Sequence, residues 1–296
     1  ARKNNIPVIM DIIDPWPEGF GRALKFVPSW IKNLLFYPML HRVKETLKNI
    51  TGVSAISNQY VNWAKNLCPQ LKQGYCFYPV ADFAEMKRQQ AISSQTVKKD
   101  PSKLRVIYAG SLASAYDIPT ILKAAERLHK KYQDKIHFAI AGSGPQTGII
   151  EDYVFKYSNL TYLGRLPKDQ LMREYYLSDI GLTQHHSGST QSVTYKLFDL
   201  LSNGLPIMNS LESEMKDIIL DNRVGLFNKP GDDKQLAENI EYCYLNRDAL
   251  NTFRENGYRL TAEQGDSAIV YGEFLDVLEG ESKPVSRYAG RLDGFD

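Results

Sequence analysis

Lys196 and Asp199 are a cation and an anion three residues apart in the segment TYKLFDLLSNG, and together they could bind a charged ligand. The leucines of this segment predict a short packed helix, and residues three apart on a helix project from one face. On a solvated helix the two would form a surface ion pair. On a packed helix, a lysine in the first turn can neutralise a phosphate, and an aspartate beside it accepts hydrogen bonds from hydroxyl groups. The surrounding elements decide between these interpretations.

A regular alternation of strands and amphipathic helices surrounds this helix from Leu104 onward. The predicted strands are LRVIYAG, KIHFAIAG, LTYLG, DIGLTQ, LPIMNS and VGLF. Apolar runs bounded by glycine and separated by helices are typical of a parallel sheet covered on both faces. The pattern therefore predicts one complete doubly wound α/β domain over residues 104–265.

Four short polar loops follow the first four of these strands, at residues 110–114, 142–145, 164–167 and 184–192. Ligands of an open parallel sheet bind outside the carboxyl ends of its strands. Loops of this kind, opening into helix N-termini, suit a phosphate or diphosphate. With Lys196 in the helix after the fourth loop, they favour phosphate binding over a surface ion pair.

The rest of the chain is less regular. Residues 1–83 contain about three strand-like segments, beginning with PVIMDII, and predict part of a second Rossmann-like domain. Residues 84–103 are polar and predict a linker. Residues 266–296 predict a C-terminal helix and tail. We expect a chain that starts midway through its first domain.

The composition excludes several classes of protein. A content of 43% hydrophobic and 24% charged residues is ordinary for a soluble globular protein. The formal charge of +2 gives no support to a nucleic-acid partner. The three scattered cysteines predict neither a disulfide framework nor a zinc site. The longest apolar run is too short to cross a bilayer. These features predict a cytoplasmic protein.

Several segments resemble the C-terminal half of a retaining glycosyltransferase of the GT-B fold. They are VIYAGSL, FAIAGSGP, YLGRLP, SDIGLT, TYKLFDLLSNGLPIMNS and VGLFNKPGDDKQLAENI, while IPVIMDIIDPWPE resembles a late part of the N-terminal domain. The most similar family is glycosyltransferase family 4, in its bacterial polysaccharide-assembly branch. The resemblance implies two Rossmann-like domains, a nucleotide-diphosphate sugar donor, a glycan or lipid-linked acceptor, no metal and no other cofactor.

The resemblance also implies roles for individual residues. The family has two glutamates separated by seven residues. The second falls on Asp199, which keeps a carboxylate for the ribose, and the first falls on Gln191, whose amide can still bind hydroxyls of the donor sugar. The backbone of Ser192, Val193 and Thr194 would face the sugar and the diphosphate.

The first loop departs from the pattern of the family. In many members an arginine and a lysine bind the phosphates, but here those places hold Ser111 and Tyr116. Lys196 is then the main positive charge on the diphosphate. Gly110 and Gly142 begin the first two loops of the expected nucleotide-sugar site.

Further contacts are implied at both ends of the donor. The backbone of Gly164, Arg165 and Leu166 would contact the base, and the Arg165 side chain would stack on it or pair with a phosphate. On the N-terminal side, many members have a histidine where the first strand ends, and none stands here. Asp14 is the candidate to touch the acceptor or the donor sugar, although a turn aspartate is an equal alternative.

Two other polar clusters have simpler explanations. His185 and His186 face the cleft in this interpretation, but two neighbours in one loop are a poor metal pair without added ligands. Asp232 and Asp233 follow Gly231 and precede a helical stretch, which predicts a helix start rather than a metal motif.

We therefore predict a retaining, hexosyltransferase-like enzyme of polysaccharide biosynthesis, with Lys196 and Asp14 as its catalytic candidates. One alternative is a binding module that holds a nucleotide sugar without turnover. Another is a nucleotide-dependent oxidoreductase, against which no G-x-G-x-x-G follows the first strand of the complete domain.

A final feature is residues 20–50, where aromatic residues alternate with lysines and arginines and Glu45 is the only acid. An interfacial helix needs both kinds of side chain, because rings settle at the headgroup level and cations meet anionic lipid. Packing of the aromatics inside the first domain is the alternative. The pattern predicts peripheral contact with the inner face of a membrane.

Overall fold

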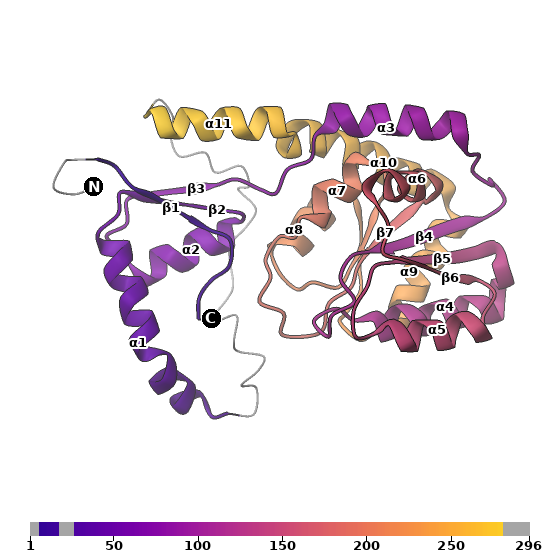
Figure 1. Ribbon diagram of the computed structural model, residues 1–296, viewed down its shortest axis with the longest axis horizontal. Coiled ribbons are helices and arrows are strands. Elements are labelled where there is room, and N and C mark those ends of the chain that lie inside the picture. The colour runs from indigo at the N-terminus through magenta and orange to yellow at the C-terminus, as the bar shows by residue number, and fades with distance from the viewer. Residues whose placement is uncertain (1–5, 18–26, 281–296) are drawn as a thin grey trace. The chain divides into compact units, whose positions relative to one another are not determined.

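The computed structural model describes residues 6–17 and 27–280, which form an α/β protein with two parallel sheets (Figure 1). The chain divides into two compact units. The small unit comprises Ala1–Pro79, Thr190–Val193 and Ile269–Asp296, and the large unit comprises Val80–Ser189 and Thr194–Ala268. Each is described by itself below.

The small unit contains a three-stranded parallel sheet in the order β1-β2-β3. Its elements are β1 (Ile9–Ile12), α1 (Ser29–Lys48), β2 (Gly52–Ala55), α2 (Asn58–Leu67) and β3 (Gln73–Cys76). The hydroxyl of Ser57 caps α2 by accepting a hydrogen bond from the Tyr60 amide at 3.2 Å. Among the described residues, no helix is long and apolar enough to cross a membrane.

The large unit contains a six-stranded parallel sheet in the order β6-β5-β4-β7-β8-β9. The strands are β4 (Leu104–Ala109), β5 (Ile136–Ala141), β6 (Leu160–Gly164), β7 (Ile180–Thr183), β8 (Ile207–Asn209) and β9 (Gly225–Phe227). This is the doubly wound order, which reverses direction between β4 and β7. The six strands expected from the sequence are confirmed within the described part of the chain.

Helices cover both faces of this sheet (Figure 1). They are α3 (Phe83–Thr96), α4 (Ile118–Tyr132), α5 (Thr147–Lys156), α6 (Lys168–Leu177), α7 (Lys196–Ser202), α8 (Glu214–Asp221), α9 (Asp233–Leu245) and α10 (Arg247–Leu260), with short turns η3 (Gln133–Lys135) and η4 (Thr261–Gly265). Helix α11 (Ser267–Glu279) follows. Helix α4 packs against α5 and α9 on one face, and α7 packs against α3 and α10 on the other.

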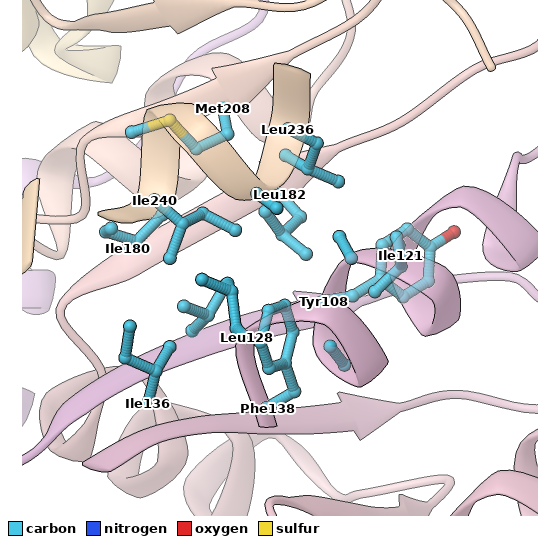
Figure 2. Packing of buried hydrophobic residues seen from close by; sticks show 14 of the residues in the cluster. Tyr108, Ile121, Leu128, Ile136, Phe138, Ile180, Leu182, Met208, Leu236 and Ile240 are labelled. Atoms are coloured by element: carbon cyan, nitrogen blue, oxygen red, sulfur yellow. The ribbon is translucent and has the colours of Figure 1, made fainter. Parts of the chain in front are cut away.

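The core of the large unit lies between β4, β5, β7 and helices α4 and α9 (Figure 2). Phe138, Ile180 and Leu182 project from the strands toward Leu128 and Ile240 of the helices, and all are almost fully buried. The apolar character of each strand on both faces is what a covered parallel sheet requires. Burial of this core fixes the positions of the strand ends and of the loops that follow them.

The segment expected to be a linker, residues 84–103, is corrected by the structure. Its first part is α3, whose N-cap Asp82 accepts a hydrogen bond from the Glu85 amide at 2.9 Å. Phe83 and Met86 are buried, and the helix packs against α6. The polar composition misled the prediction because only a few apolar positions of a helix are needed to attach it to a core.

The sheet generates a stability prediction at Gly225, which pairs with Ile207 across β8 and β9. A Cβ at this position would lie 2.0 Å from the Ile207 carbonyl oxygen. We expect Gly225→Ala to reduce the free energy of unfolding by more than about 2 kcal/mol, because backbone atoms would have to move apart. Urea denaturation measures the change.

The control is Gly148→Ala in α5, where a Cβ would meet no atom within 4 Å. It should leave stability unchanged or raise it by up to about 1 kcal/mol, because alanine favours a helix over glycine. Equal stability of the two variants would contradict the packing described for β8 and β9.

Candidate functional site

A pocket of about 440 Å³ opens at the carboxyl ends of β4, β5 and β6 in the large unit. It lies where an open parallel sheet is expected to bind its ligand. The lining residues come from the three strand-end loops and from α6 and α7: Ala109, Gly110, Ser111, Ala141, Gly142, Ser143, Arg165, Leu166, Leu171, Tyr175 and Asp199.

The loops after β4, β5 and β6 are locked together by their backbones. The Gly110 amide donates to the Ala141 carbonyl at 3.0 Å, and the Gly142 amide donates to the Gly164 carbonyl at 2.7 Å. A Cβ at Gly142 would lie 1.9 Å from the Gly110 carbonyl oxygen, so the two turns approach too closely for any side chain there. The sequence predicted that these glycines serve a ligand site. In the structure their amides hold the turns together, and their lack of side chains leaves the pocket floor open.

Lys196 is the first residue of α7, and its side-chain amine lies beside the Gly110 turn. A Cβ placed on Gly110 would lie 2.7 Å from Lys196 Nζ. The Nζ atom is buried and makes no hydrogen bond to any residue that the structure describes. It lies 4.0 Å from the centre of the Tyr108 ring and 5.0 Å from that of Tyr116. Burial lowers the pKa of Lys196 to about 7, against a smaller opposing effect of Asp199.

Asp199 lies one helical turn further along α7 and lines the pocket itself. Its Oδ2 accepts a hydrogen bond of 2.9 Å from the hydroxyl of Tyr175, which projects from α6. Burial raises the pKa of Asp199, while Tyr175 and Lys196 act in the opposite direction. A carboxylate that accepts hydrogen bonds therefore lines the pocket, and a buried amine one helical turn away lies beside the Gly110 turn.

Tyr175 is a site residue that the sequence analysis missed. It is almost fully buried, and it is one of two adjacent tyrosines on α6. Burial, followed by the charge of Asp199, raises the pKa of its hydroxyl, so Tyr175 remains a hydrogen-bond donor at neutral pH. The helical spacing of α6 could have indicated its burial, because Met172 and Tyr175, three residues apart, are the buried positions of this helix.

The structure brings together six of the predicted site residues as pocket lining: Gly110, Ser111, Gly142, Arg165, Leu166 and Asp199. Gly164 adjoins them at the end of β6, and Lys196 lies behind Gly110. Thr194 also belongs to the large unit, and its carbonyl accepts a hydrogen bond from the Leu197 amide in the first turn of α7.

The remaining predicted residues, Asp14, Gln191, Ser192 and Val193, belong to the small unit. Asp14 is exposed, and its charge contributes to a Tyr60 pKa raised to about 12, chiefly by burial. The Tyr60 hydroxyl donates to the Thr190 carbonyl at 3.1 Å and accepts from the Ser192 amide at 3.2 Å. The Ser192 amide, expected to face the sugar and the diphosphate, therefore already has a partner in the structure.

The histidines and the acidic pair do not form a metal centre in the structure. His186 lies 3.7 Å from the carboxylate of Asp117, and His185 packs its ring on Tyr116. Asp232 caps α9 by accepting from the Gln235 amide at 2.8 Å, so the predicted helix start is confirmed. Among residues 6–17 and 27–280, no group of three or more His, Cys, Asp or Glu side chains could hold a metal ion.

Comparison with known families assigns the chain to a class. The family described as "Glycosyl transferases group 1" matches residues 89–260, which is more than half of the 296 residues. The protein belongs to this family of glycosyltransferases. No match was found among curated protein sequences.

Solved structures show the same GT-B fold at low sequence identity. Sucrose-phosphate synthase from Thermosynechococcus elongatus has 14% identity and a TM-score of 0.66, covering 93% of this chain and 74% of that one. Anabaena HepE in complex with UDP has 11% identity and a TM-score of 0.69, covering 93% and 72%. The pneumococcal O-GlcNAc transferase GtfA, in complex with UDP and GlcNAc, has 16% identity and a TM-score of 0.62, covering 81% and 47%.

The burial of Lys196 predicts a pH-dependent stability. Its pKa is about 7 in the folded protein, whereas an exposed lysine titrates near 10.4. Between these two pH values the unfolded chain therefore binds more protons at Lys196 than the folded protein does. The free energy of unfolding then rises with pH across this window, by at most about 1.4 kcal/mol per pH unit. We expect Lys196→Met to be more stable than the wild type at pH 7, and this advantage to shrink toward pH 10.

Urea denaturation at several pH values measures this difference. The exposed Lys123 on α4 provides the control, because Lys123→Met should differ from the wild type by an amount that does not depend on pH. A Lys196→Met difference that is equally flat would show that the Lys196 amine is hydrated and not buried.

Proposed function

We propose that this glycosyltransferase moves a sugar from a nucleoside diphosphate sugar, with retention at the anomeric carbon, to a glycan or lipid-linked acceptor in polysaccharide biosynthesis. The observation that carries the proposal is the pairing of a pocket-lining carboxylate, Asp199, with the Lys196 amine one turn away. Membership of the glycosyltransferase family and the resemblance to the polysaccharide-assembly branch of family 4 support it. Solved neighbours of the fold were crystallised with UDP, with UDP-glucose, or with UDP and GlcNAc.

Asp199 would hold the two ribose hydroxyls of the donor. Tyr175 donates to one carboxylate oxygen, so the other is available to accept from the sugar. The diphosphate would then extend over the loops that begin at Gly110 and Gly142, where the absence of side chains allows close approach. The backbone at Arg165 and Leu166, which also line the pocket, would contact the base.

Lys196 would stabilise the leaving diphosphate. Negative charge builds up on the diphosphate as the bond to the anomeric carbon breaks, and a cation placed in advance lowers the energy of that state more than that of the ground state. Asp14 and Gln191 would act on the sugar side, Asp14 touching the acceptor or the donor sugar and Gln191 binding hydroxyls of the donor. We propose that no metal and no cofactor takes part.

The test of the donor site is calorimetric titration with UDP. Lys196→Ala should weaken binding by roughly 1.5–3 kcal/mol, the size of a lost charge-assisted hydrogen bond. Asp199→Asn should cost less overall and should penalise UDP more than 2′-deoxy-UDP, because only the ribose offers two hydroxyls. Lys123→Ala, an exposed lysine on α4, is the control and should bind UDP as the wild type does.

The titrations are run in excess EDTA, in which binding should persist. Unchanged UDP and GDP affinity in Lys196→Ala would contradict the phosphate role of the lysine, and equal losses for ribo- and deoxyribonucleotide would contradict the ribose role of Asp199. Turnover of a donor sugar separates an enzyme from a binding module that holds the nucleotide without reacting. NMR detection of an inverted anomer in the first product would rule out retention.

We also propose that residues 20–50 contact the cytoplasmic face of a membrane. Residues 20–26, including Lys25, lie outside the described part of the chain. In α1, Trp30, Leu34 and Tyr37 follow one helical stripe and are 69%, 69% and 66% exposed. The same stripe continues into Lys44 and Lys48, so rings and cations share one side of the helix, as interfacial helices require.

Co-sedimentation with vesicles measures this contact. We expect the protein to bind anionic vesicles at low salt, to bind neutral ones weakly, and to lose binding as salt is raised. Charge reversal at Lys44 and Lys48 of this stripe, together with Lys25, Lys32 and Arg42, should abolish it, whereas Lys123→Glu on α4 should not. Protein that stays in the supernatant with anionic vesicles at low salt would show that the segment does not bind lipid.

A further inference from the structure

The Lys196 amine occupies an aromatic cage inside the large unit. Its two walls are the rings of Tyr108 from β4 and Tyr116 from the loop before α4, whose centres are 6.4 Å apart at an interplanar angle of 65°. Nζ lies 4.0 Å from the first ring centre and 5.0 Å from the second. Gly110 lines the pocket, and a Cβ placed on it would lie 2.7 Å from Nζ, so the amine adjoins the Gly110 turn.

The cage is held in place by contacts that do not involve the lysine. The Tyr108 hydroxyl donates to the Ser111 carbonyl at 2.7 Å. The Tyr116 amide donates to the Ala113 carbonyl at 3.0 Å, and the Tyr116 carbonyl accepts from Gln146 Nε2 at 3.0 Å. Residues from two different strand-end loops therefore fix the backbone that carries the Tyr116 ring. A rigid pair of rings is expected to determine where the flexible lysine side chain rests.

Few charges face the amine from the elements packed around it. Among the residues that the structure describes, Asp199 on the same helix is the charged group that acts on Lys196, and its carboxylate already accepts from Tyr175. His185 touches Tyr116 with ring centres 5.2 Å apart. Asp117 lies beside His186 and caps α4 through the Thr120 amide at 3.2 Å and the Thr120 hydroxyl at 2.7 Å.

A buried ammonium with little counter-charge is costly, and such a group tends to give up its proton. This agrees with the lowering of the Lys196 pKa to about 7 by burial. An anion that binds at the Gly110 turn offsets this cost. A diphosphate carries up to three negative charges, and at this distance they favour the ammonium strongly in a poorly solvated site. The two rings then present their negative faces to the cation.

We propose that Tyr116 is a positioning residue which, with Tyr108, stores the Lys196 amine beneath the Gly110 turn, and that binding of a nucleoside diphosphate makes this amine take up one proton from solvent. The inference rests on the proposed donor site. The step forms one N–H bond, with the proton supplied by water or buffer, and no other bond changes.

Proton uptake is measured by calorimetric titration of UDP at pH 8 in buffers with different ionisation enthalpies. At this pH the terminal phosphate, whose second pKa is about 6, is already ionised, so it contributes little. An amine that is mostly neutral before binding and charged afterwards takes up roughly 0.9 proton per UDP. Affinity should fall about five- to tenfold per pH unit between pH 7.5 and 9.

Two variants of Tyr116 separate a positioning role from a merely structural one. Tyr116→Phe keeps the ring and should keep the proton uptake. Tyr116→Ala admits water to the amine, so Lys196 stays charged in the free protein and uptake at pH 8 should fall to near zero while UDP still binds. Circular dichroism confirms that both variants are folded.

The wild type alone can overturn the proposal: UDP binding whose heat does not depend on the buffer shows that Lys196 is charged throughout. Equal proton uptake in Tyr116→Ala and the wild type would show that the Tyr116 ring does not determine the protonation state of Lys196. If no nucleotide binds the wild type between pH 6.5 and 8, the donor site fails together with this inference. Binding without proton uptake leaves the donor site standing and refutes the inference only.

Discussion

The large unit is organised around a lysine amine buried without a hydrogen bond to any described residue. Several features follow from this constraint. Position 110 favours glycine, because its φ of +152° is one that other residues rarely adopt and a Cβ there would lie 2.7 Å from Nζ. Lys196 is the first residue of α7, which places its side chain beside the Gly110 turn after β4. The walls around the amine have to be aromatic, since rings tolerate both a neutral amine and a cation.

The parallel sheet makes this arrangement possible. Because β4, β5 and β6 end at one edge, their turns can interlock through backbone hydrogen bonds and leave a pocket floor without side chains. The reversal of strand order between β4 and β7 then brings α7 to the same edge from the other half of the sheet. Asp199 and Lys196 thus come from one helix. The Asp199 carboxylate lines the pocket, and the Lys196 amine lies beside the Gly110 turn.

Much of this fold is predictable from sequence, because glycine-bounded apolar runs mark each strand of the large unit and its loops. What the sequence does not show is which side chains from distant segments meet. Helix α3 was mistaken for a linker because it is anchored by few apolar residues such as Phe83 and Met86. Tyr175 was missed because only the packing register of α6 turns it toward Asp199. The position of Lys196 was anticipated, but its burial depends on Tyr108 and Tyr116, which are far away along the chain.

We expect the Lys196 amine beside Gly110 to bind the diphosphate of the donor. A crystal structure of the protein with UDP would show whether this contact forms. The diphosphate should lie over the turns at Gly110 and Gly142, with Lys196 Nζ within hydrogen-bonding distance of a phosphate oxygen and the ribose hydroxyls on Asp199. A nucleotide bound elsewhere, or a diphosphate in this pocket with Lys196 still enclosed by the two tyrosines and touching no phosphate, would contradict it.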